Sequence, residues 1–473
     1  MTLMKGSGLW VVAAAAAITA CGATTRPDLR RLYEFGMPAA GQPPVIVIPG
    51  ILGSKLRDPA SGAELWPGPL GSLLFGAKEQ LALPFDPVSL QPASEARPDG
   101  LFEAVLGSDF YGEILRTLER DGGYRRTQPG TKVDGRGRRY YVFAYDWRQD
   151  NVRTAARLDA FIEQIRRDYG DPQLKVDIVA HSMGGLVTRY FLRYGGEDVL
   201  PILHRADFRV SDAGAAKVRT AILLGTPNLG SANSLHGFIE GAEVGLRRIP
   251  TEVLATMPSA FQLFPHPVND WLIDLKGEPL DRDLFDVDIW RRFEWSVFSP
   301  EAIERLQPRG AVYLADLQRL FEAYLERARR FVWALSVKPE KDAGVRIVVF
   351  GGDCSLTPAR LLVEEVDGDS MARLHPEEIA HPLPGVDYSR LMLEPGDNQV
   401  TKPSLLAREK LDPTAERHRW LFFPLAYSFF LCEEHQKLTG NLSFQDNLLN
   451  VLLSRERPWD APGRAVPSGS TRP

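Results

Sequence analysis

Short apolar runs rich in β-branched and aromatic residues recur along the chain, and each ends in glycine or polar residues. Such runs predict buried strands, whereas the stretch 154–169 has the apolar period of an amphipathic helix. The expected strands are residues 45–48, 140–147, 176–179, 220–224 and 345–350. Because strands alternate with helical stretches, the pattern predicts an α/β fold class. Its sheet should be mostly parallel, with functional loops at the carboxyl ends of the strands.

Two segments do not follow this alternation. Residues 58–105 are rich in Pro, Gly, Leu and Phe, and residues 228–340 form a long, largely helical insertion between two expected strands. We expect both to be cap or lid insertions in a domain that covers residues 43–456. Residues 457–473 include the run PGRAVPSGSTRP, whose composition is typical of a disordered tail.

The N-terminus has the pattern of an export signal. Lys5 precedes an apolar stretch, 9–20, which is too short to span a bilayer comfortably. The letters ITAC, which end at Cys21, resemble a bacterial lipobox, whose cysteine is acylated after cleavage. We therefore expect a signal peptide at 1–21, lipidation of Cys21 and a linker at 22–42. The protein would then be lipid-anchored in a bacterial cell envelope, in the periplasm or at the outer membrane. Cleavage as an ordinary signal peptide would instead give a secreted protein.

Composition narrows the classes of function. The chain has 473 residues, 44% of them hydrophobic, which is enough for a large core, and its net charge is −5. Its 56 basic residues are spread among 61 acidic ones, so no basic stripe indicates nucleic-acid binding. No His, Cys and carboxylate cluster has metal-ligand spacing, and we expect neither metal nor cofactor. Besides Cys21, the cysteines are Cys354 and Cys432, which either form a disulfide or remain buried thiols. The pattern does not indicate an oligomeric state.

The segment VDIVAHSMGGLVTRYFLRY, residues 176–194, places a serine between a strand and a helix. It fits the G-x-S-x-G frame of a nucleophile elbow, with Ala180 in place of the first glycine and Ser182 at the centre. The following helix points its free N–H groups back towards the serine, and the N–H of Met183 suits an oxyanion. The alternative is an ordinary turn in which Ser182 caps the helix. His181 directly precedes the serine, and we expect its role to be structural.

A serine nucleophile in this setting needs an acid and then a histidine later in the chain. His435, in CEEHQKLTGN, lies on a loop before a helix near the end of the domain and is the candidate base. His418, in AERHRW, lies among charges, as is typical of the surface. Asp397, in EPGDNQV, and Asp353, directly after a predicted strand, are both candidates for the acid, and the pattern alone leaves this choice open.

These segments together resemble the lecithin:cholesterol acyltransferase family, which includes lysosomal phospholipase A and the phospholipid:diacylglycerol acyltransferases. PVIVIPGILGSKL resembles its first core strand and oxyanion loop, and GDNQV its G-D-G-T-V acid loop. EEHQKLTGNLSFQDNLL resembles the region of its catalytic histidine. Counterparts of YDWR at 145–148, AHSMGG at 180–185 and GTPNLGS at 225–231 occur in the same order. The resemblance runs from about residue 44 to residue 453.

The resemblance implies an α/β-hydrolase fold and serine-dependent acyl transfer through an acyl-enzyme. Ser182 would be the nucleophile, and His435 would take its proton. The likeness of the acid loop favours Asp397 as the group that orients the imidazole. Ile51 and Met183 would donate backbone N–H groups to the oxyanion.

Three other residues of these motifs are candidates for a functional or a structural role. Trp66, in ELWPGPLGSLLFG, falls where the family carries an aromatic residue beside the lipid site, so it is a candidate for lipid binding. A core position is the alternative. Asp146 and Arg148, paired at a strand end, are expected to support the scaffold rather than to catalyse.

The function implied is an O-acyltransferase or a phospholipase A-type acyl hydrolase in lipid metabolism. Its donor would be a phospholipid or another lipid ester at a membrane surface, and its acceptor water or a lipid alcohol. A general carboxylesterase or a triglyceride lipase would use the same residues. A non-catalytic lipoprotein that binds lipid is a further alternative, and the intact Ser, His and Asp set argues against it.

Overall fold

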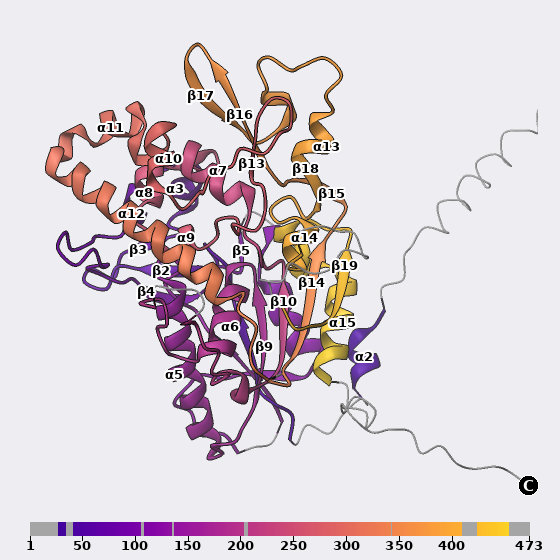
Figure 1. Ribbon diagram of the computed structural model, residues 1–473. Coiled ribbons are helices and arrows are strands. Elements are labelled where there is room, and N and C mark those ends of the chain that lie inside the picture. Colours follow the sequence, from indigo (N-terminus) through magenta and orange to yellow (C-terminus); the bar gives the residue numbers. More distant parts are fainter. Residues whose placement is uncertain are drawn as a thin grey trace, which may run out of the picture.

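The computed structural model describes residues 27–34, 41–105, 108–134, 137–202, 207–341, 343–408 and 423–453 (Figure 1). The expected signal peptide, the lipidation site Cys21 and the expected tail lie outside these residues, and so does His418. Within the described ranges, no helix is both long enough and apolar enough to cross a membrane.

Seven strands form the central sheet, and all neighbouring pairs are parallel, which confirms the predicted α/β class. Their order is β19-β14-β10-β9-β1-β8-β7. The strands are β1 Val45–Ile48, β7 Tyr124–Arg126, β8 Arg138–Val142, β9 Val176–His181, β10 Val218–Leu224, β14 Arg346–Gly352 and β19 Leu425–Leu431. The pattern did not predict β7 and β19, which lie at the two edges of the sheet. β8 begins two residues earlier and ends five residues earlier than predicted, and the chain turns farther on, where the N–H of Gln149 bonds to the carbonyl of Asp146 (3.0 Å).

Helices cover both faces of the sheet, because side chains along each strand alternate between the faces. In β1, Ile46 and Ile48 pack into one buried cluster, and Val45 and Val47 pack into another. The first cluster contains α5 (Asn151–Tyr169) and α6 (Met183–Tyr194). The second contains α2 (Leu29–Tyr33), α4 (Gly112–Arg116) and α15 (Leu442–Leu453). The core is therefore a three-layer α/β/α arrangement (Figure 1).

Part of the expected linker is ordered. Helix α2 lies within residues 22–42, yet Leu29 is buried and the hydroxyl of Tyr33 donates to Asp446 Oδ1 on α15 (2.7 Å). Helix α2 is therefore attached to the core.

The segment 58–105 is fastened to the sheet by the YDWR motif. It contains β3 (Glu64–Trp66), α3 (Leu70–Phe75) and β4 (Arg97–Leu101), and both strands pair with β2 (Ser54–Arg57). Arg148 and Asp146 form a buried two-pronged ion pair (2.9 and 2.8 Å). Arg148 also donates to the carbonyl of Leu81, and Asp146 accepts from the N–H of Ala96. The pair therefore holds this segment in place, as a scaffold role requires.

Further chain between β10 and β19 builds a cap. Its helices are α7 (Ala232–Glu240), α8 (Thr251–Leu254), α9 (Pro258–Phe261), α10 (Val287–Arg292), α11 (Pro300–Leu306) and α12 (Ala311–Ala334). A second part contains β15 (Ser355–Pro358), β16 (Leu361–Val366), β17 (Asp369–Arg373) and β18 (Leu393–Gly396). Figure 1 shows α10, α11 and the β16–β17 hairpin above the sheet, towards the top of the view.

Candidate active site

Ser182 occupies a strained corner between β9 and α6. Its φ and ψ are 53° and −126°, values that a residue other than glycine rarely adopts and that are typical of a nucleophile elbow. The corner is crowded, because a Cβ on Gly184 would lie 2.4 Å from the carbonyl oxygen of Pro49. The side chain of Ser182 makes no capping hydrogen bond to the helix. The corner therefore presents the hydroxyl to other groups, and the helix-cap alternative does not apply.

The structure brings Ser182, His435 and Asp397 together in hydrogen-bonding order. His435 Nε2 lies 3.0 Å from Ser182 Oγ, and His435 Nδ1 lies 2.8 Å from Asp397 Oδ2. Ser182 and His435 are each 8% exposed and Asp397 is fully buried, so little water reaches the three groups. The backbone N–H of His435 also donates to the carbonyl of Asp397 (2.9 Å). The acid loop and the histidine loop are thus joined through both backbone and side chain.

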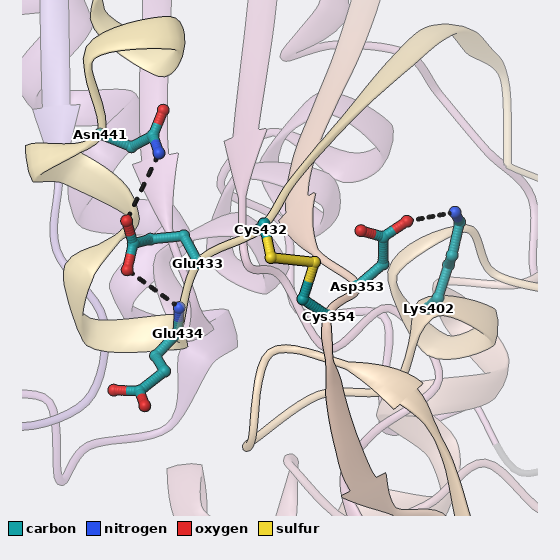
Figure 2. The surroundings of a disulfide bond; sticks show 7 residues. All are labelled: Asp353, Cys354, Lys402, Cys432, Glu433, Glu434 and Asn441. Atoms are coloured by element: carbon teal, nitrogen blue, oxygen red, sulfur yellow. Dashed lines mark hydrogen bonds and ion pairs between the residues drawn. A yellow bond between two sulfur atoms is a disulfide. The ribbon is translucent and has the colours of Figure 1, made fainter. Parts of the chain in front are cut away.

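The other acid candidate lies in a different environment. Asp353 forms an ion pair with Lys402 (2.6 Å), and both side chains are about a quarter exposed. Figure 2 shows this pair beside the disulfide, with the Asp353 carboxylate directed to the lysine. Of the two candidates, only Asp397 bonds to the His435 ring within the described contacts.

The acid loop keeps its shape although its sequence departs from G-D-G-T-V. Asn398 stands where the family has glycine and adopts a φ of 75°, which asparagine tolerates better than most residues. Asp397 Oδ1 accepts the backbone N–H groups of Gln399 (3.1 Å) and Val400 (2.8 Å), contacts that need no particular side chain. Ser231, from the GTPNLGS motif, donates to the carbonyl of Gln399 (2.6 Å). The substitutions therefore leave the carboxylate held in position.

The predicted oxyanion donors lie on the two segments that meet at the serine. Met183 is the first residue of α6, and Ile51 follows the end of β1. Among the described groups, none accepts a hydrogen bond from either backbone N–H. Both donors therefore remain available to a ligand.

Trp66 belongs to the core and not to an exposed lipid-contact surface. The interpretation of this residue as an exposed lipid contact is therefore wrong, and the core position is the correct alternative. It is 2% exposed and packs edge-on against Trp147 and Phe102. Its indole N–H donates to the carbonyl of Leu52 (2.7 Å), the residue after Ile51. The tryptophan is buried because its large apolar ring fills the space under this loop, and its one polar atom finds an acceptor there.

A disulfide joins the ends of two adjacent strands close to the base. Cys354 follows β14 and Cys432 follows β19, and their sulfur atoms are bonded, which decides between the two alternatives left by the sequence (Figure 2). Cys432 lies three residues before His435, and Glu433 between them accepts from Asn441 (3.4 Å). The histidine loop is therefore fastened to the strand end from which the acid-bearing segment departs.

The immediate surroundings of the acid and base are polar. A hollow of about 460 Å³ is lined by Asp397 and His435 together with Asp109, Phe110, Asn398, Gln399, Glu434, Gln436 and Lys437. Among the described residues, no group of three or more His, Cys, Asp or Glu side chains could hold a metal ion. The chemistry available is that of a serine hydroxyl, an imidazole, a carboxylate and backbone N–H groups. Such a set can transfer an acyl group through an ester on the serine.

Comparison with known proteins agrees with this chemistry. Residues 135–296 match the family model described as lecithin:cholesterol acyltransferase. Lysosomal phospholipase A and acyltransferase of Rattus norvegicus is 31% identical over 189 residues, which cover 35% of this chain and 45% of the relative. An uncharacterized protein of Saccharomyces cerevisiae is 26% identical over 252 residues, or 52% of this chain and 33% of the relative. The chain spans less than half the length of these curated relatives.

The fold also has a solved counterpart. A chain of the Tle4–Tli4 complex superposes with a TM-score of 0.54 at 18% identity, covering 87% of this chain and 98% of that chain. The likeness concerns the fold alone. With the parallel sheet and the strand–serine–helix corner, it identifies the α/β-hydrolase fold.

Proposed function

We propose that this chain, which belongs to the lecithin:cholesterol acyltransferase family, is a serine-dependent acyl hydrolase or O-acyltransferase that acts on lipid esters. The observation that carries the proposal is the hydrogen-bonded series from Ser182 Oγ through His435 to Asp397, at the carboxyl end of the parallel sheet. Family membership supports lipid esters as the substrate class.

The proposed mechanism gives each group a role that its hydrogen bonds support. A carboxylate only accepts hydrogen bonds, so His435 carries its proton on Nδ1, and its Nε2 lone pair faces the Ser182 hydroxyl. Ser182 Oγ attacks the ester carbonyl while Nε2 takes the hydroxyl proton. The N–H groups of Ile51 and Met183 bind the oxyanion of the tetrahedral intermediate, each worth roughly 3 kcal/mol. His435 then protonates the leaving alcohol, which departs and leaves an acyl ester on Ser182.

The second half of the reaction decides between hydrolysis and transfer. Water or a lipid alcohol gives its proton to His435 Nε2 and attacks the acyl-enzyme. The attack forms a second tetrahedral intermediate. Its collapse releases free fatty acid or a new ester, and His435 returns the proton to Ser182 Oγ. Transfer dominates when a lipid alcohol reaches the intermediate before water.

A membrane surface is the proposed source of substrate, and exposed apolar side chains on α3 and on the neighbouring β11–β12 hairpin support this. Leu70 and Phe75 of α3 are 44% and 60% exposed, and Leu246, between β11 (Ala242–Val244) and β12 (Arg247–Ile249), is 71% exposed. The N–H of Leu246 donates to the carbonyl of Leu74 (3.1 Å), which places this hairpin against α3. Adjacent exposed apolar side chains favour contact with lipid. Replacing Phe75 and Leu246 by serine should weaken cosedimentation with phospholipid vesicles.

The lipid anchor is proposed separately. Stable attachment to a membrane generally requires more than one acyl chain. A lipobox cysteine carries several, so an acylated Cys21 would keep the enzyme at an envelope membrane. Mass spectrometry of the mature N-terminus tests this directly. An unmodified cysteine would leave a secreted enzyme.

Labelled substrate tests the proposed function. Purified protein is incubated with vesicles of an acyl-labelled phospholipid, with and without diacylglycerol or a sterol, and products are separated as free fatty acid or new ester. We expect the wild type to form one or both and Ser182→Ala to form neither, with unchanged circular dichroism. Turnover of soluble short-chain esters alone would indicate a general carboxylesterase. If the wild-type protein turns over no ester and its Ser182 does not react with a fluorophosphonate, the proposal fails and a lipid-binding role replaces it.

A further inference from the structure

The histidine before the nucleophile contacts the base. The ring centroids of His181 and His435 are 4.9 Å apart, and His181 Nε2 lies 3.3 Å from the backbone carbonyl oxygen of His435. A carbonyl oxygen only accepts a hydrogen bond, so Nε2 of His181 must carry the proton. The other ring nitrogen, Nδ1, is then an acceptor.

A buried tyrosine supplies the matching donor. The hydroxyl oxygen of Tyr111 lies 2.9 Å from His181 Nδ1 and also accepts the backbone N–H of Gly50 (2.9 Å). Since Nδ1 is unprotonated, the hydroxyl proton points to it. The hydrogen bonds therefore run in one direction, from the Gly50 N–H through Tyr111 and His181 to the carbonyl of His435.

Burial preserves this direction. Tyr111 is 4% exposed, and burial raises the pKa of its hydroxyl, so it stays protonated. Burial of the ring, with a smaller effect of the neighbouring His435, lowers the pKa of His181 to about 3. His181 therefore stays neutral even while His435 carries the proton taken from Ser182.

The series joins two parts that act together in the proposed chemistry. Gly50 precedes Ile51, the proposed oxyanion donor, and a Cβ on Gly50 would lie 2.7 Å from the Cβ of Ser182. The loop thus packs directly against the nucleophile, and the far end of the series is the base itself. Reacting groups tolerate little displacement, since a shift of about 1 Å can cost roughly a hundredfold in rate.

We propose that Tyr111 and His181 are positioning residues that couple the oxyanion loop at Gly50 to the backbone of the base His435. The proposal rests on the proposed acyl-transfer function of Ser182. Neither residue exchanges a proton with substrate. Their effect is to keep the oxyanion donor and the base in register during both acylation and deacylation.

Removing the tyrosine hydroxyl tests the coupling. Tyr111→Phe leaves the Gly50 N–H without its acceptor and His181 Nδ1 without its donor. We expect kcat on a p-nitrophenyl ester, and the rate of fluorophosphonate reaction with Ser182, to fall about 10- to 100-fold. KM should not change, because the tyrosine hydroxyl makes no contact with substrate in the proposed mechanism.

A matched control removes the same kind of hydroxyl elsewhere. Tyr190, on α6, accepts the N–H of Val199 (3.0 Å) and donates to the carbonyl of Glu197 (2.9 Å). Tyr190→Phe should lower thermal stability by a similar amount to Tyr111→Phe but leave kcat per folded molecule at the wild-type value. The folded fraction is measured by circular dichroism and by the endpoint of fluorophosphonate titration.

Substitutions at His181 give a second, independent test of the coupling. His181→Gln keeps one acceptor and one donor and should recover most of the activity, whereas His181→Leu should lose as much as Tyr111→Phe. The double variant Tyr111→Phe/His181→Leu should fall no further than the worse single variant, since both break one series.

The outcomes separate the two proposals. If the wild type turns over esters but Tyr111→Phe matches Tyr190→Phe in kcat, or raises only KM, the coupling is refuted while the function of Ser182 stands. Losses that multiply in the double variant also refute it. If the wild type neither labels at Ser182 nor turns over any ester, the proposed function itself fails, and the coupling fails with it.

Discussion

Replacing Asp397 by asparagine should force His435 into the wrong tautomer. In the structure, Asp397 Oδ1 accepts the N–H groups of Gln399 and Val400, and Oδ2 accepts from His435 Nδ1. Asparagine offers one acceptor and one donor in these places. With its oxygen towards the two backbone donors, its NH₂ faces Nδ1, which must then lose its proton. The proton moves to Nε2, where Ser182 needs an acceptor.

The alternative orientation of the amide costs more. Turning the NH₂ towards the backbone would leave the N–H groups of Gln399 and Val400 without their acceptor. The N–H of Val400 is buried, so its loss alone costs roughly 1–3 kcal/mol. We therefore expect kcat of Asp397→Asn to fall about 10⁴-fold, which corresponds to ~5.5 kcal/mol of barrier. Initial rates with a p-nitrophenyl ester and a labelled phospholipid, per folded molecule, measure this loss.

Asp353→Asn is the control. It removes the ion pair with Lys402, whose side chains are 28% and 27% exposed, so stability should change by about 0–1 kcal/mol. Its kcat should stay within about threefold of wild type. The reasoning is refuted if Asp397→Asn keeps more than a tenth of wild-type kcat, or if Asp353→Asn is the more harmful of the two at equal stability.

Two further predictions concern the groups around the base. Gly225→Ala should lower kcat more than about tenfold, because the added Cβ would lie 2.9 Å from His435 Cε1 and 3.0 Å from its Nδ1. Gly62→Ala has a similar φ, +71° against +60°, with open space around it, and equal rate losses in both variants would exclude the steric cause. Cys354→Ala/Cys432→Ala opens a crosslink over 78 residues and should lower the free energy of unfolding by about 4.5 kcal/mol. Urea unfolding measures it, and a loss below about 1 kcal/mol would contradict the loop-closure estimate.

The elbow could be predicted from the sequence because its features are local. A buried strand, a serine between small residues and an amphipathic helix follow one another within residues 176–194. The structure has the same three features in this order, as β9, Ser182 and α6. The parallel sheet was predictable for the same reason, since continuous β-branched runs such as Val45–Ile48 are typical of strands that are buried on both faces.

Other features depend on contacts that the pattern does not contain. Tyr111 meets His181 across 70 positions of sequence, and no motif around the tyrosine marks it as part of the site. The cysteine pairing was equally open, because two cysteines are compatible with a bond only when the fold brings their Cα atoms close, here to 4.9 Å. Trp66 could not be placed in the core or at the surface by its neighbours, since Leu65 and Pro67 on either side of it are only partly buried.

The position of each candidate group in the site follows from how far its partners lie along the chain. Ser182 is oriented by its own corner, whereas His435 reaches Asp397 over 38 positions and Ser182 over 253. Side chains that come from distant parts of the chain must be held together by tertiary contacts. At the base, these contacts are the disulfide at Cys432 and the hydrogen bond from the backbone N–H of His435 to the carbonyl of Asp397. The serine could therefore be identified from its local sequence, while the acid needed the likeness of a loop to separate it from Asp353. A side chain that is positioned by such long-range contacts can be identified from sequence only when a recognisable motif surrounds it.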